Sequence, residues 1–160
     1  MDKYLIKKAE IDTMRGLDKT HFLNPKAKRI NKSLGDLTGL TGIGFHLIEL
    51  APGSESTEYH VHYFEDECVY ILSGSGKVII DDKSYDIGAG DFIGYRKGGL
   101  AHTMLNTGKE VLKCIVVGER LAHDVADYPK QKQRIYRNAG HPADLVDMEK
   151  ISHPQVGKKV

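Results

Sequence analysis

Three histidines and one glutamate stand in the middle of the chain at spacings that suit metal binding: His60, His62, Glu67 and His102. Side chains at positions i and i+2 of a β-strand point to the same face, so His60 and His62 are expected to project together. Glu67 has the wrong parity to share that face in one continuous strand, but a hairpin turn over residues 63–66 would reset the phase. His102 would then arrive from another strand. A His-x-His pair taken alone also fits two partly exposed histidines at a sheet edge.

The apolar surroundings of these residues favour the metal interpretation. Val69 and Ile71 follow Glu67 at alternate positions, so a strand there would turn the carboxylate towards the interior. Burying several ionisable groups is costly unless they are paired or coordinate a cation. Three imidazoles and a carboxylate suit one divalent transition metal (Fe, Mn, Ni, Zn or Cu), and an octahedral shell would leave about two positions open for a ligand.

Residues 40–118 are dense in short segments that contain β-branched and aromatic residues and are separated by turns with Gly, Asp or Asn. Such close spacing favours antiparallel neighbours in a sandwich or barrel, because a parallel crossover needs about a dozen residues or more. The predicted strands are residues 43–50, 58–62, 67–73, 77–80, 84–87, 91–95, 102–106 and 111–117.

The two flanks, residues 1–39 and 119–160, show weaker patterns, and we interpret them as extensions that wrap the barrel. Residues 144–150 could form a helical turn, although the apolar positions only roughly suit that period. The C-terminal flank also contains a basic stretch that could contact phosphates but is better explained as a solvated or dimer-facing segment. Its basic residues are Lys130, Lys132, Arg134 and Arg137.

Composition and charge exclude several classes of protein. The chain has 160 residues, enough for one domain with its own core, and 23 basic against 22 acidic residues give a formal net charge of +1. No overall field therefore attracts nucleic acid or an anionic membrane. The longest apolar run, Cys68 to Leu72, is far shorter than the roughly 20 residues of a spanning helix.

The expected cellular compartment is the cytoplasm, because residues 1–8 have charges on both sides of two apolar residues and lack the apolar core of a signal peptide. Cys68 and Cys114 both lie in apolar segments. We expect them to be buried free thiols, since a cytoplasmic chain of this size needs no disulfide.

The central segment resembles the cupin family. The first cupin motif is Gly, His-x-His, then Glu with six residues before a further Gly, and the second is Gly, Pro, Gly, His and Asn. The chain departs from them in the loops, where Gly53 is one residue further from His60, Arg96 stands in place of Pro, and the loop before His102 is one residue longer. The matching positions are Gly53, His60, His62, Glu67 and Gly74, then Gly90, Gly98 or Gly99, His102 and Asn106.

This resemblance implies an all-β cupin double-stranded β-helix, or jelly-roll barrel, over residues 40–118, with short N- and C-terminal extensions at 1–39 and 119–160. It also implies that His60, His62, Glu67 and His102 hold the metal. The candidates for a substrate pocket are Tyr70, Tyr95, Arg96, Asn106 and His46, although strand phase alone does not prove that any of them faces inward.

Two functions remain open for a mononuclear metal-binding cupin that coordinates a small oxygen-rich metabolite. The first is a metal-dependent enzyme of the isomerase, dioxygenase or decarboxylase type; a weaker similarity of the flanks points to small bacterial cupins described as sugar-phosphate isomerases. The second is a non-catalytic binding or sensor module, because the fold supports both. We expect a homodimer in which one or both flanks cover strands of the partner barrel. The flanks contain apolar residues, and packing on a partner would bury them.

Overall fold

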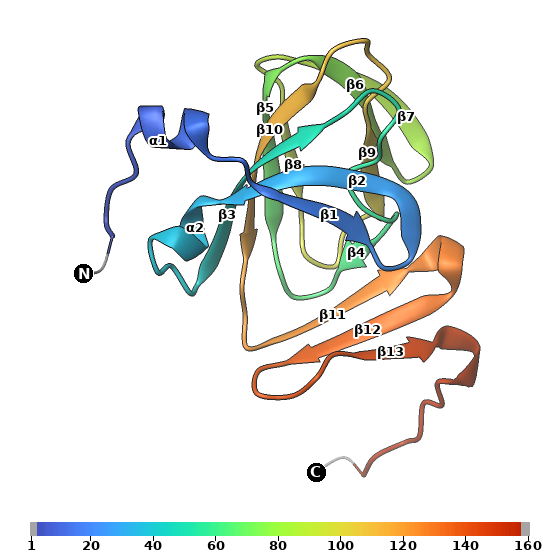
Figure 1. The fold of residues 1–160 in the computed structure, drawn as a ribbon. Coiled ribbons are helices and arrows are strands. Elements are labelled where there is room, and N and C mark those ends of the chain that lie inside the picture. Colours follow the sequence, from blue (N-terminus) through green and yellow to red (C-terminus); the bar gives the residue numbers. More distant parts are fainter. Residues whose placement is uncertain (1–2, 158–160) are drawn as a thin grey trace.

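The computed structural model describes residues 3–157, so the first two residues of the N-terminal extension and the last three of the C-terminal extension lie outside it. Almost all regular structure in this range is β (Figure 1). The strands are β1 (Leu17–His21), β2 (Asn24–Ser33), β3 (Ile43–Leu50), β4 (Val61–His62), β5 (Glu67–Ser73), β6 (Ser75–Ile80), β7 (Lys83–Gly88), β8 (Phe92–Tyr95), β9 (His102–Leu105), β10 (Leu112–Glu119), β11 (His123–Tyr128), β12 (Gln133–Asn138) and β13 (Asp144–Asp147). The short helices are α1 (Lys8–Thr13), α2 (Leu34–Leu37), η1 (Pro129–Gln131) and η2 (Met148–Lys150).

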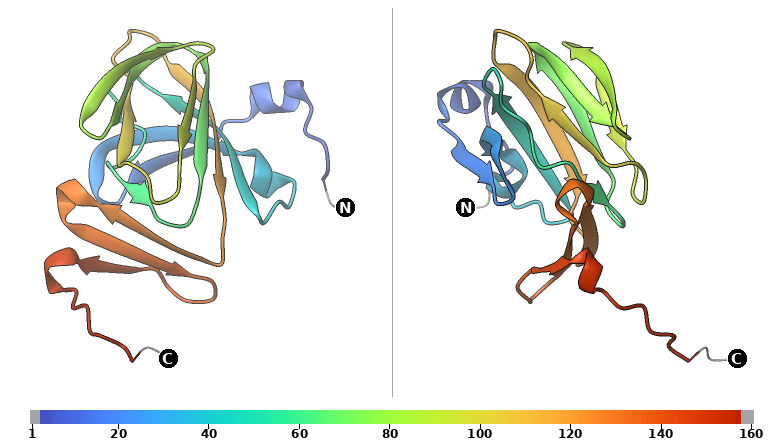
Figure 2. Two further views of the ribbon diagram at one scale, coloured as in Figure 1. Left: turned by 180° about the vertical axis from the view of Figure 1, so that it is seen from behind. Right: turned by 90° about the vertical axis from the view of Figure 1, so that its right-hand side faces the viewer.

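The barrel is built from two antiparallel sheets that face each other. The larger sheet has the order β1-β2-β3-β10-β5-β8, and the smaller one has the order β7-β6-β9. Figure 2 shows β1 to β3 on one side of the barrel and β6 and β7 on the other. This is the predicted jelly-roll architecture, and seven of the predicted segments are strands to within two residues at each end. In the eighth, residues 58–62, only Val61–His62 forms a strand.

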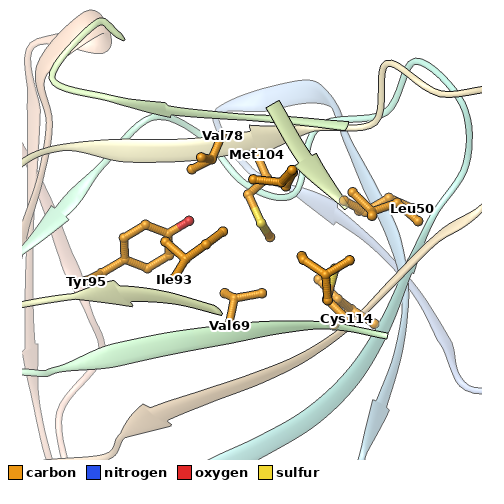
Figure 3. Close-up of a cluster of buried hydrophobic side chains, with 11 residues drawn as sticks. Leu50, Val69, Val78, Ile93, Tyr95, Met104 and Cys114 are labelled. Carbon is orange, nitrogen blue, oxygen red and sulfur yellow. The ribbon is translucent and has the colours of Figure 1, made fainter. Parts of the chain in front are cut away.

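The hydrophobic core fills the space between the two sheets (Figure 3). It is drawn from alternate positions of each strand, as the two-residue period of a strand requires when one face is buried. Cys114 is buried within it and Cys68 is half-buried, and both are free thiols as predicted. The core residues are Ile48, Leu50, Val69, Ile71, Val78, Ile87, Ile93, Tyr95, Met104, Leu112 and Cys114.

Both flanks add strands to the barrel of their own chain. On the N-terminal side β1 and β2 form a hairpin, and β2 pairs with β3 so that Asn31 lies opposite Ile48. On the C-terminal side β11, β12 and β13 form a sheet that reaches β4, with Ala126 opposite His62. Both flanks are therefore positioned to contribute side chains to the interior of the barrel.

The sequence interpretation of residues 144–150 as a helical turn is wrong for its first half. Residues Asp144–Asp147 pair with β12, and only Met148–Lys150 forms a helical turn. The apolar spacing of residues 144–150 only weakly favours a helix, and hydrogen bonding of residues 144–147 to the edge strand β12 is the conformation adopted instead. None of the helices within residues 3–157 is long and apolar enough to cross a membrane.

Candidate metal centre

The structure brings the three predicted histidine ligands together. His60 directly precedes β4, His62 ends that strand, and His102 is the first residue of β9. His60 and His102 exchange two backbone hydrogen bonds, of 3.1 and 2.8 Å, which hold the two residues side by side. The ring centre of His60 lies 4.7 Å from that of His102 and 4.9 Å from that of His62.

Backbone carbonyl groups fix the orientation of two of these rings. Nδ1 of His60 lies 2.8 Å from the carbonyl oxygen of Glu58, and Nδ1 of His102 lies 3.1 Å from that of Leu100. A carbonyl oxygen can only accept a hydrogen bond, so each Nδ1 carries the proton and donates it. Nε2 of each ring therefore keeps its lone pair, which is the form that binds a metal.

A buried carboxylate orients the third ring. Nδ1 of His62 lies 2.7 Å from Oδ2 of Asp124, which is fully buried on β11. Although burial raises the pKa of Asp124, its hydrogen bonds with His62 and Arg137 lower the pKa to about 2. An ionised Asp124 can only accept, so His62 also carries its proton on Nδ1 and presents Nε2.

Glu67 shares its face of β5 with Val69, as the sequence predicts, and both line the same cavity as the histidines. The register places Glu67 between Gly118 of β10 and Tyr95 of β8. Burial raises the pKa of the Glu67 carboxyl, and the positive charge of His62, when protonated, and of Arg29 opposes that rise. A bound cation would act in the same direction and favour the ionised carboxylate.

These side chains fit a divalent transition metal. Nε2 of His102 is buried and has no hydrogen-bond partner among the described residues, and an unsatisfied buried polar atom costs about 1–3 kcal/mol. Burial lowers the pKa of His60 well below its usual value, and burial lowers that of His102 to about 4. Both rings are therefore neutral at pH 7, as metal ligands must be. Three imidazole nitrogens and one carboxylate match the preferences of such an ion.

A different group, His62, Glu65 and Asp124, is the one among residues 3–157 in which three ligand-type atoms all lie within 4.8 Å of one another. Its charges are already compensated, because Arg137 donates to both Glu65 and Asp124. Glu65 also accepts a 2.9 Å hydrogen bond from the backbone of Leu121. We therefore assign this group to orienting His62 rather than to a separate metal site.

The four predicted ligands open into a cavity of about 390 Å³, which is large enough for a small metabolite. Tyr95 stacks on His102 with ring centres 3.5 Å apart and planes 3° from parallel, so it forms part of the wall beside the histidines. The other residues that line the cavity are Lys19, His21, Arg29, Asn31, His46, Ile48, Ser56, Thr57, Val69, Met104, Val116, Arg120 and Tyr128.

Two of the five sequence candidates for the pocket, Tyr95 and His46, line this cavity. The other three lie elsewhere. Tyr70 is exposed on the outer face of β5, and Arg96 is exposed in the turn after β8. Asn106 is fully buried, but its side-chain amide donates to the carbonyl groups of Leu50 and Glu110 and thereby stabilises the turn before β10.

Sequence reasoning missed the contribution of the flanks to the cavity. His21 lacks the spacing of the predicted metal ligands, but it is half-buried and lines the cavity together with Lys19. A signal was present in the spacing Lys19-x-His21 and Arg29-x-Asn31, because residues two apart on a strand share one face. It was not used because neither strand was predicted. Asp124 gave no such signal, because its partner His62 is 62 residues away in the sequence.

Comparison with known proteins identifies the fold. The family model described as "Cupin domain" matches residues 46–118. A crystal structure from Acidithiobacillus ferrooxidans is 49% identical, with 96% of this chain and 98% of that chain covered and a TM-score of 0.92. Residues 46–118 of this chain are a cupin domain. The Acidithiobacillus protein is described, provisionally, as a sugar phosphate isomerase.

Two further solved cupins show how far the likeness extends. A sugar phosphate isomerase from a cupin superfamily, from Silicibacter pomeroyi, is 24% identical, with a TM-score of 0.79 and coverage of 92% of this cupin and 98% of that chain. A predicted oxalate decarboxylase of Thermotoga maritima is 29% identical, covers 59% of this chain and 80% of its own, and has a TM-score of 0.50. No curated protein matches this chain. The extensions outside the barrel are therefore shared with the first two structures rather than with the third.

Proposed function

We propose that this cupin is a mononuclear metal-dependent isomerase, that His60, His62, Glu67 and His102 hold its metal, and that its substrate is a small polyhydroxylated metabolite. The observation that carries the proposal is the orientation of the three histidines. Each Nδ1 is engaged by a fixed acceptor, so all three Nε2 atoms are left to bind a metal next to Glu67. The description of the Acidithiobacillus relative supports a sugar phosphate as the substrate.

The chemistry of such a reaction fits the side chains in the cavity. Isomerisation of an aldose to a ketose moves the proton on C2 to C1 and the hydroxyl proton on O2 to O1, so it requires no external oxidant or reductant. A divalent metal bound at the histidines would polarise the substrate carbonyl and stabilise negative charge on its oxygen. The protein must then supply a group that exchanges a proton with the substrate, within a cavity that limits the access of water.

His46 is our candidate for the proton-exchanging group. Its Nδ1 is buried without a hydrogen-bond partner among residues 3–157, and its side chain lines the cavity. Burial lowers the pKa of His46, and the charge of Arg120 lowers it further. A neutral imidazole at pH 7 can both accept and return a proton.

Tyr95 is suited to orienting the substrate. Its hydroxyl group is buried and has no partner within the described chain. Burial raises the pKa of Tyr95, so the hydroxyl stays protonated and can donate a hydrogen bond to a substrate oxygen.

The proposal is tested by incubating the metal-loaded protein with a panel of aldose phosphates in D₂O and following ketose formation and deuterium incorporation by proton NMR. We expect conversion by the wild type and by His141→Gln, which changes an exposed histidine. His46→Gln is expected to bind metal normally but to lose at least about 100-fold in rate, the usual contribution of an acid or base. A wild type that binds metal and ligand but converts none of the panel would favour the non-catalytic binding module instead.

A further inference from the structure

Two positive charges face each other at the wall of the cavity formed by the N-terminal hairpin. Lys19 of β1 and Arg29 of β2 are direct partners in the antiparallel register, and both line the cavity. Like charges at directly opposed positions destabilise a hairpin. Within residues 3–157 neither side chain forms a direct ion pair with a carboxylate. The charge of Glu67 acts on Arg29 only from beyond ion-pair distance, so the two cations have no contacting anion in the described protein.

Asn31, two residues after Arg29 on β2, adds a hydrogen-bond donor without an acceptor to the same wall. Asn31 is only 4% exposed, it lines the cavity, and its Nδ2 has no hydrogen-bond partner among the described residues. Arg29 is oriented by one hydrogen bond from Nη1 to the carbonyl oxygen of Ser56. Its other guanidinium N–H groups have no recorded acceptor in the described chain. Arg29 and Asn31 therefore present donors to the cavity for which the described protein provides no acceptor.

The remaining side chains around this wall are neutral or already paired. Nδ1 of His21 accepts a 3.2 Å hydrogen bond from the backbone N–H of Leu23, and burial, followed by the charge of Arg29, lowers the pKa of His21, so its ring is neutral at pH 7. Arg120 is paired with Asp36 outside the cavity. Glu67 is the only acidic side chain among the cavity-lining residues, and it belongs to the metal centre. A ligand that fills the cavity should therefore carry negative charge at the end near the hairpin.

We infer that Lys19, Arg29 and Asn31 form a binding subsite for the phosphoryl group of the ligand. A phosphoryl dianion would balance both cations, and its terminal oxygens would accept from the guanidinium and the amide together. A single carboxylate would leave one cation unbalanced. That the opposite end of the ligand reaches the histidines rests on the proposed function, whereas anion binding at the hairpin does not.

The experiment uses inorganic phosphate as the probe and the full chain with its metal removed by chelation. Binding is followed by calorimetry or by ³¹P NMR, at ionic strength held constant with chloride, because screening alone would otherwise alter affinity. The variants are Arg29→Gln and Lys19→Gln, and the matched control is Lys28→Gln, which removes a neighbouring exposed charge that does not line the cavity. Thermal melts establish that each variant is folded. If Arg29→Gln is unstable, Lys19→Gln still tests the subsite, because it changes an exposed side chain and should fold normally.

The wild type and Lys28→Gln are expected to bind phosphate alike and to prefer it to acetate. Each subsite variant should weaken binding about 10- to 100-fold, as expected for a lost hydrogen bond to a charged group. Equal affinity in all four proteins, absence of saturable binding, or a preference for acetate would overturn the subsite. Loss of phosphate binding in Arg29→Gln supports the subsite even if elemental analysis finds no metal at the histidines, an outcome that would overturn only the proposed function.

Discussion

Replacement of Asp124 by asparagine should weaken metal binding without a matching loss of fold. Asp124 is the partner that fixes the proton of His62 on Nδ1, through a contact of 2.7 Å. An asparagine can present its NH₂ group to the ring instead and so favour the wrong tautomer. Loss of such a partner behind a metal-bound histidine typically costs about 10- to 100-fold in affinity, which corresponds to about 1.4–2.7 kcal/mol.

Asp127→Asn is the matched control for this prediction. Asp127 lies on the same strand as Asp124, is 5% exposed against 0%, and is likewise paired with an arginine, Arg134. It contacts none of the predicted metal ligands through its side chain; its side-chain partners are Arg134 and Tyr63. Both variants remove the pairing of a buried carboxylate with an arginine, so both should lower the melting temperature, but only Asp124→Asn should lower metal affinity.

The assay is a competition for metal between the protein and a chromophoric chelator, with melting curves recorded for the metal-free and metal-loaded forms. The wild type and Asp127→Asn should give the same dissociation constant, and Asp124→Asn a larger one. Equal metal affinities for Asp124→Asn and the wild type, or equal losses in both variants, would refute the argument that Asp124 acts through His62.

Three further predictions concern the fold, its acid stability and its assembly. Chelation should leave a cooperative unfolding transition with only a lowered melting temperature, because the apolar core is complete without a metal; loss of cooperativity would contradict this. Hydrogen bonds from Arg120 and Ser33 lower the pKa of Asp36 from 3.8 to about 2, so its stabilisation is present above pH 3.8 and lost as pH falls through about 2. Asp36→Asn should therefore flatten the acid limb of a plot of melting temperature against pH, and an unchanged limb would contradict the pairing. Both flanks pair with strands of their own barrel, so the reason first given for a homodimer, flanks that cover a partner barrel, does not hold for them. The homodimer stays a prediction, now with the exposed outer face of β5 and β8, where Tyr70 lies opposite Phe92, as its contact; light scattering at micromolar concentration should give twice 17.8 kDa, and a mass of 17.8 kDa would contradict it.

The sequence predicted the barrel and the face of its strands because the relevant signals are local. The segments 43–50 and 67–73 match β3 and β5 at both ends, since each is a short segment rich in apolar residues that is bounded by turn residues. The two-residue period of a strand placed Glu67 on the face of Val69. All four basic residues of the C-terminal stretch form ion pairs within the chain. The partners of Arg134 and Lys132 are Asp127 and Glu149, whereas Arg137 pairs with the distant Glu65 and Lys130 with the distant Asp82.

The cavity wall and the support of the ligands could not be predicted in this way. Lys19 and Arg29 become neighbours only because of a hairpin whose strands consist mostly of polar residues, so no hydrophobic alternation marked them. Asp124 reaches His62 only through pairing of β11 with β4, which is a contact between distant parts of the chain. Tyr70 was misleading although its position between the inward-facing Val69 and Ile71 already places it on the outer face of the strand. Asn106 was misleading because it follows the end of β9, where strand phase no longer applies.

The central claim, that His60, His62, Glu67 and His102 form one metal site, is tested most directly by elemental analysis of the purified protein. The proteins compared are the wild type, the double variant His60→Ala/His62→Ala, and the control His141→Ala/His153→Ala, which removes two exposed histidines. We predict one transition-metal ion per chain in the wild type and the control, and almost none in the variant at His60 and His62. A wild type that stays substoichiometric under every loading condition, or equal metal content in all three proteins, would contradict the account.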